Sequence, residues 1–174
     1  MRQIQYTMKP QDVVILLKII AWNNNNWQQS ALADALKISQ SEISQSVARS
    51  KYSGLLDTDG KKVMRLGFID FLQYGLSYVF PQRPGALVRG IPTAHSAPPL
   101  SALINSSEIY VWPYAKGTVR GQTIGPLYPS VVKAVIEDEK LYQLLALTDA
   151  LRVGKVREKN IAIKELKNKF QNEL

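Results

Sequence analysis

The chain has 174 residues, of which 45% are hydrophobic, and it carries a formal net charge of +8. This composition excludes a globally disordered chain, because enough apolar side chains are present to build a core. The absence of cysteine excludes a disulfide scaffold, thiolate metal sites and a cysteine nucleophile. The basic charge, with an isoelectric point near 9.7, favours nucleic acid or another anionic surface as a partner.

The first predicted helix spans residues 10–22, PQDVVILLKIIAW. Pro10 suits a first helical position, and Asp12 suits the positive end of the helix dipole. The segment is apolar on almost every side, which predicts a place in the core or partly in a subunit interface. Asp12 and Lys18 interrupt the run and no small-residue cleavage site follows, so we expect neither a signal peptide nor a membrane span. The absence of cysteine fits a reducing cytoplasm.

Two further helices are predicted over residues 28–37 and about 40–52, joined by Lys37-Ile38-Ser39. Ser39 and Glu42 have the spacing of a capping box, in which each side chain satisfies a free backbone N–H group at the helix start. Gly54 is the expected stop of the second helix. Two helices joined by about three residues predict a helix-turn-helix unit, backed by the first helix.

Helical periodicity predicts a polar outer face for the second helix of this unit. Gln pairs with adenine, Arg pairs with guanine, and Ser contacts bases or phosphates in a major groove. Side chains near the start of a recognition helix normally reach the base edges. The candidate base-reading residues are therefore Gln40, Ser41, Ser44, Gln45 and Arg49, and the candidate contacts to the DNA backbone are Ser39, Lys51, Lys61, Lys62 and Arg65.

The stretch LADALKISQSEISQSVARSKYSGLL resembles the DNA-binding unit of bacterial winged helix-turn-helix transcription regulators, especially the MarR-like group. The resemblance covers residues 10–65 at best and implies a cytoplasmic bacterial regulator that binds duplex DNA and represses its own or a neighbouring operon. We expect a homodimer, because a single recognition helix reads few bases and two-fold operators place their half-sites about 34 Å apart. The sequence departs from the pattern in three ways: Lys37 replaces the usual Gly, Ser46 and Ser50 stand where Leu is frequent, and DTDGKK makes only a short wing. The alternative is a protein-interaction or RNA-associated module, such as a partner in a toxin–antitoxin or phage-defence operon.

The remaining chain predicts a helix over residues 64–79, with Phe68, Phe71, Leu72, Gly75, Tyr78 and Val79 on one face. Residues 80–100 contain five prolines and predict an extended segment. Two short strands around a turn are expected within residues 108–124, and helices are expected near 130, over 138–151 and over 155–170, the last two separated by Gly154. The hairpin that carries Lys116 and Arg120 is an alternative wing.

The predicted fold is mainly α with short β hairpins. It comprises a winged helix-turn-helix domain at residues 1–80, a proline-rich connector at 81–107 and a small α+β domain at 108–174, which is also a possible site for a protein partner. His95 is the only histidine, and no catalytic constellation is present, so we expect no metal, no cofactor and no enzymatic activity. The segment RGIPTAHSAPP predicts a structural strap or, alternatively, the lining of an effector pocket. The basic tail helix is either a solvated face, a contact to DNA flanks or part of a dimer interface.

Overall fold

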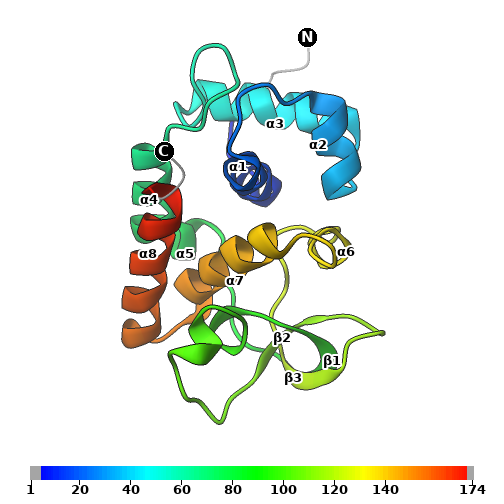
Figure 1. The fold of residues 1–174 in the computed structure, drawn as a ribbon, viewed down its shortest axis with the longest axis vertical. Helices are drawn as coiled ribbons and strands as arrows, with labels where there is room; N and C mark the ends of the chain where they lie inside the picture. Colours follow the sequence, from blue (N-terminus) through cyan, green and yellow to red (C-terminus); the bar gives the residue numbers. More distant parts are fainter. Residues whose placement is uncertain (1–4, 172–174) are drawn as a thin grey trace.

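The computed structural model describes residues 5–171 as eight α-helices, two short 3-10 helices and one small three-stranded sheet (Figure 1). The N-terminal elements are α1 (Pro10–Trp22), α2 (Gln29–Leu36), α3 (Gln40–Tyr52), α4 (Arg65–Tyr74) and α5 (Leu76–Val79). The central elements are β1 (Leu87–Pro92), η1 (Ala94–Ser96), η2 (Leu100–Ala102), β2 (Tyr110–Pro113) and β3 (Val119–Thr123). The C-terminal helices are α6 (Val131–Ala134), α7 (Glu139–Val153) and α8 (Val156–Gln171).

Helix α1 lies in the centre of the molecule, as its apolar sequence predicts. It packs against α2 and α3 on one side and against α7 on the other (Figure 1). All residues from 11 to 20 are buried, including Asp12 and Lys18, which pair with Arg49 and Asp138. One continuous cluster of buried apolar side chains extends from α1 to α8. Packing therefore crosses the boundaries predicted at residues 80 and 107.

The sheet corrects two predictions about the middle of the chain. Strand β1, which lies inside the expected connector, pairs antiparallel with both β2 and β3. Strands β2 and β3 pair in parallel, so the turn between them does not close a hairpin. Gly90 permits this arrangement, because a Cβ atom there would lie 1.9 Å from the carbonyl oxygen of Trp112. The sequence predicted short hairpins, whereas the structure is a mixed α/β fold.

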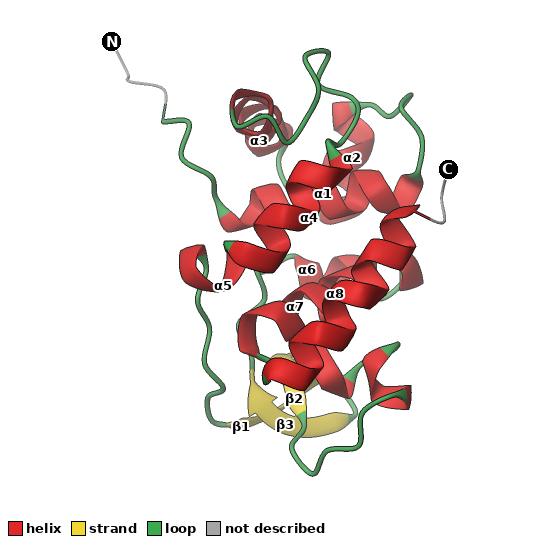
Figure 2. Ribbon diagram, turned by 90° about the vertical axis from the view of Figure 1, so that its left-hand side faces the viewer, coloured by secondary structure: helices red, strands yellow, loops and turns green. Residues whose placement is uncertain are grey.

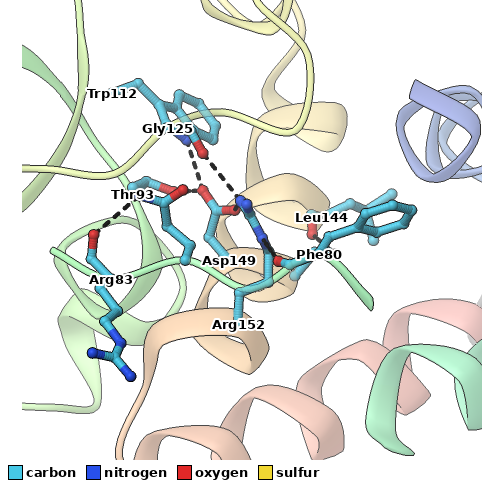
Figure 3. Close-up of polar contacts among 10 residues, drawn as sticks. Phe80, Arg83, Thr93, Trp112, Gly125, Leu144, Asp149 and Arg152 are labelled. Carbon is cyan, nitrogen blue, oxygen red and sulfur yellow. Dashed lines mark hydrogen bonds and ion pairs between the residues drawn. The ribbon is translucent and has the colours of Figure 1, made fainter. Parts of the chain in front are cut away.

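A buried polar cluster fixes the sheet to α7 (Figure 3). The carboxylate of Asp149, only 1% exposed, accepts hydrogen bonds from Thr93 Oγ1 (2.8 Å), Trp112 Nε1 (2.7 Å) and Arg152 NH1 (2.9 Å). The Arg152 guanidinium also donates to the backbone carbonyls of Phe80 and Gly125. Because a buried charge is costly unless it is paired and hydrogen-bonded, these contacts hold the sheet in one position on α7.

The helix predicted over residues 64–79 is broken at Gly75. A Cβ atom at this position would lie 3.0 Å from the ring of Phe71, and α5 continues in a different direction (Figure 2). Tyr78 and Val79 are therefore 84% and 51% exposed instead of sharing the buried face of Phe68. The C-terminal predictions are confirmed, since Asp138 caps α7 and Gly154 separates α7 from α8.

In the part of the chain that the structure describes, no helix is both long and apolar enough to cross a membrane.

Candidate nucleic-acid interface

Helices α2 and α3 meet at the joint predicted from the sequence. Lys37 ends α2 in the left-handed conformation, with φ of 56°, which is the strained geometry expected for a non-glycine residue at this turn. The hydroxyl of Ser130, which precedes α6, donates a 2.6 Å hydrogen bond to the carbonyl of Leu36. The C-terminal part of the chain thus satisfies a carbonyl that the end of α2 leaves unpaired.

The capping box at the start of α3 is confirmed only in part. Ser39 Oγ accepts a hydrogen bond from the backbone N–H of Glu42 at 3.2 Å, as predicted. The Glu42 carboxylate does not return to Ser39 but accepts from Gln11 Nε2 of α1 at 3.1 Å. The only acidic side chain of α3 is therefore turned toward α1 and away from the outer face.

The outer face of α3 is polar and carries no acidic group. Four of the five candidate base-reading residues are exposed there: Gln40, Ser41, Ser44 and Gln45. Gln45 Nε2 donates to Ser41 Oγ at 3.3 Å, one helical turn away, so these two side chains lie side by side. The face extends through Ala48 and Lys51 to the end of the helix. Amide and hydroxyl groups on an acid-free face match the hydrogen-bonding groups of base edges and phosphates.

The prediction that Arg49 reads bases is wrong. Its side chain is 5% exposed and donates from Nε and NH2 to the Asp12 carboxylate, with a shortest distance of 2.7 Å. This hydrogen bond is the main cause that raises the pKa of Arg49. Asp12 also accepts from the backbone N–H of Lys9 at 2.8 Å, so it caps α1 and anchors α3 at once. Arg49 is a structural clamp between the two helices.

The inner face of α3 consists of Ile43, Ser46, Val47 and Ser50, which recur at helical spacing and are all buried. Among residues 5–171, neither Ser46 Oγ nor Ser50 Oγ has a hydrogen-bond partner, although both atoms are inaccessible to solvent. Small side chains at these positions let α3 approach α1 closely, but each leaves a buried hydroxyl unsatisfied.

The short wing predicted from DTDGKK is present as a minimal hairpin closed by a bridge between Leu56 and Val63. Asp57 Oδ1 accepts from the backbone N–H groups of Lys61 and Lys62, and these hydrogen bonds lower the pKa of Asp57. Gly60, with φ of +69°, packs on α3: a Cβ atom there would lie 3.0 Å from Cδ of Lys51. The hairpin therefore rests on the C-terminal end of α3.

The basic residues around the hairpin differ in how they are used. The ammonium of Lys61 donates to the Trp27 carbonyl at 2.6 Å and lies 4.5 Å from the centre of its ring. The Trp27 indole N–H returns a hydrogen bond to the Lys61 carbonyl at 2.9 Å. Lys61 is therefore committed to the fold, which corrects its predicted role as a phosphate contact. Lys62 is exposed, and Arg65 is half-buried at the first position of α4.

One feature of this region was not predicted. Tyr6, in the segment before α1, stacks on Tyr52 at the end of α3, with ring centroids 4.0 Å apart and planes 12° from parallel. The Tyr52 side chain remains 71% exposed. The N-terminal segment thus lies beside the C-terminal end of α3. The contact could not be predicted, because no local signal in the sequence links Tyr6 to a residue so far along the chain.

Other basic groups lie away from α3. The sheet is at the opposite end of the molecule in Figure 1, so Lys116 and Arg120, which flank and occupy β3, do not form a wing beside α3. Helix α8 buries its apolar side, through Ala162, Ile163 and Leu166, against the core. Within residues 5–171, no group of three or more His, Cys, Asp or Glu side chains is placed to hold a metal ion.

Comparison of the chain with family models, with curated proteins and with solved structures finds no match. The likeness to winged helix-turn-helix regulators rests on the residues of α2, α3 and their joint.

Proposed function

We propose that the protein binds duplex DNA sequence-specifically through α3 and acts as a transcription regulator, in the manner of a repressor. The observation that carries the proposal is the division of α3 into two faces. One face is fixed to α1 by the Arg49–Asp12 pair, and the other presents Gln40, Ser41, Ser44 and Gln45 without an acidic neighbour. A rigid helix with exposed amides and hydroxyls meets the requirement for reading base edges in a major groove about 12 Å wide.

The net charge of +8 supports the same proposal, because phosphate neutralisation supplies most of the affinity of non-specific DNA binding. A homodimer is part of the proposal. A single recognition helix reads few bases, and two-fold operators place their half-sites about 34 Å apart. The resemblance to bacterial regulators further implies a cytoplasmic location.

The test is selection of bound duplexes from a random pool, followed by affinity measurements on the enriched site. Gln45→Ala should weaken binding to that site by about 1–3 kcal/mol and change binding to random duplex little, because a lost base contact affects only the matching sequence. Lys116→Gln, at the sheet end of the molecule, is the matched control. Failure to enrich any motif at moderate salt, or equal losses on both duplexes, contradicts base reading by α3.

A second candidate function is a protein-interaction module. Its specific support is the exposure of three large apolar side chains on α4 and α5: Leu66, Tyr74 and Tyr78 are 81%, 68% and 84% exposed. Exposed apolar side chains mark a protein interface when they form one patch. Recovery of a stoichiometric partner whose binding is lost in Tyr78→Ser, together with DNA affinity that does not respond to Gln45→Ala, would favour this candidate.

A further inference from the structure

We infer that a pocket between the α1–α2 connection and the hairpin binds a phosphate group, and that duplex DNA supplies this phosphate. The assignment to DNA rests on the proposed function, whereas binding of the anion itself does not. The pocket has a volume of about 200 Å³. Its polar lining consists of Asn23, Asn24, Asn25, Lys62 and Arg65, and its apolar lining consists of Ile19, Ile20 and Val63.

The amide groups of the pocket are oriented by their internal hydrogen bonds. Asn23 Oδ1 accepts from Arg65 NH2 at 3.1 Å, and Asn24 Oδ1 accepts from the backbone N–H of Asn26 at 3.1 Å. These bonds turn the two oxygens toward groups of the protein, and the NH₂ group of each amide can only donate. Asn23 and Asn24 can therefore offer NH₂ donors to a ligand in the pocket.

The cationic groups add only further donors. The Arg65 guanidinium donates one N–H to the Phe170 carbonyl at 2.7 Å and one to Asn23 Oδ1 at 3.1 Å. A guanidinium carries five N–H groups, so further donors remain for a ligand. Lys62 is exposed at the rim, and its ammonium contributes three donors. No aspartate or glutamate belongs to the lining of this pocket in the described part of the chain. A ligand that complements such a lining accepts hydrogen bonds and carries negative charge, as a phosphate does.

The size and the floor of the pocket fit this ligand. A single water needs only about 10–15 Å³ of such volume, so the pocket admits a group of several heavy atoms. Ile19, Ile20 and Val63 are each at most 4% exposed and form an apolar floor. A low local dielectric below the anion strengthens its attraction to Lys62 and Arg65 relative to a fully solvated surface.

The position of the pocket favours DNA as the source of the phosphate. The two hydrogen bonds between Trp27 and Lys61 join the α1–α2 connection to the hairpin. The hairpin in turn rests on Lys51 of α3 through Gly60. In Figure 1 these three segments share the top of the molecule, away from the sheet. A duplex with α3 in its major groove has backbone on both sides of that groove, and the pocket lies on the hairpin side.

The direct test of the site is a titration of the ¹⁵N-labelled full-length protein with inorganic phosphate, at ionic strength matched by sodium chloride. The side-chain NH₂ signals of Asn23, Asn24 and Asn25 should shift with phosphate and not with chloride. Lys62→Gln and Asn25→Ala should reduce the shifts of the remaining signals, whereas Lys116→Gln should not. If phosphate shifts these signals no more than chloride does, the inference is overturned.

The second arm distinguishes DNA from a free phosphate compound. Binding to a non-specific duplex is measured over a series of salt concentrations for the full-length protein. Loss of one cationic phosphate contact lowers the magnitude of the slope of log K against log salt by about 0.9, so Lys62→Gln should flatten the dependence. The uncharged change Asn25→Ala should weaken binding and leave the slope as it is, because it removes no phosphate neutralisation. If phosphate shifts the amides but Lys62→Gln has the slope of the wild type, the anion site stands and its assignment to DNA is overturned. A wild type that binds no duplex refutes the proposed function and that assignment, while the phosphate titration still decides the site.

Discussion

Replacement of Arg49 by methionine tests how α3 is held against α1. Methionine keeps the unbranched apolar stem but removes the guanidinium, so Asp12 loses three N–H contacts at 2.7–3.2 Å and keeps only the backbone N–H of Lys9. The carboxylate is 1% exposed, so water cannot replace the lost donors. Removing one partner of a buried ion pair costs about 3–5 kcal/mol, a large part of the roughly 5–15 kcal/mol that stabilises a typical domain.

The assay is urea-induced unfolding at neutral pH, followed by circular dichroism. Arg49→Met should lower the free energy of unfolding by about 3–5 kcal/mol without changing the urea dependence, since the surface exposed on unfolding is nearly the same. For a chain of this length the midpoint of thermal unfolding should fall by about 6–20 °C. Lys51→Met, two residues further along α3 and on its exposed face, is the matched control and should stay within about 0.5 kcal/mol of the wild type.

A double-mutant cycle separates the pair from other effects. Asp12→Asn, on α1, leaves the Arg49 charge buried without its counterion. It should therefore also lower the free energy of unfolding strongly. Combining it with Arg49→Met removes both charges, and the double variant should lose less stability than the sum of the single losses. Additive losses, or a cost below about 1 kcal/mol for Arg49→Met, would refute the clamp and return Arg49 to the exposed face.

Three further predictions concern the buried hydroxyl of Ser46, the left-handed backbone of Lys37 and the hydrogen-bonded carboxylate of Asp57. Ser46→Ala should raise the free energy of unfolding by about 1 kcal/mol, because it removes a buried hydroxyl without a partner among the described residues; a loss in urea unfolding would show that the hydroxyl is hydrogen-bonded. Lys37→Gly should add about 1 kcal/mol in the same assay by relieving the left-handed backbone, unless the lysine side chain makes a compensating contact. The pKa of Asp57 is lowered below its ordinary value of about 3.9, so its stabilisation is complete above that pH and is lost as the pH falls through the folded pKa. Asp57→Asn should therefore reduce the stability difference between about pH 5 and about pH 2, and an unchanged difference would contradict the hydrogen bonds from Lys61 and Lys62.

The helices of this fold could be predicted from the sequence because their signals are local. Pro10 and Asn23 delimit α1, Ser39 and Gly54 delimit α3, and Asp138 starts α7. Each signal depends on the geometry of a few neighbouring residues, which the sequence specifies directly. The sheet could not be predicted in this way, because β1 pairs with strands at least 18 residues away. No local sequence signal specifies which strand pairs with which.

The candidate site was predicted in part for the same reason. Helical periodicity placed Ser41 and Gln45 on the outer face, but it placed Arg49 beside that face as well. The partner of Arg49 is Asp12, 37 residues earlier, and periodicity within one helix contains no information about a second helix. A signal did exist: Asp12 is an acid in a helix apolar on nearly all sides, and such a group requires a buried counterion. The pocket lined by Asn23, Lys62 and Arg65 likewise depends on a tertiary contact, the hydrogen bond between Asn23 and Arg65.

Helix α1 has eleven consecutive buried residues, from Gln11 to Ala21, so this stretch has no solvent-facing side. Hydrogen exchange of a backbone amide requires at least local separation of the packed elements around it. Neither α3 nor α7 can leave α1 without exposing side chains such as Val14 and Leu17, which are both 0% exposed. The amides of α1 should therefore exchange only when the whole molecule unfolds. The recognition helix and the C-terminal helices then belong to one cooperative unit, and the exposed face of α3 is as stable as the core beneath it.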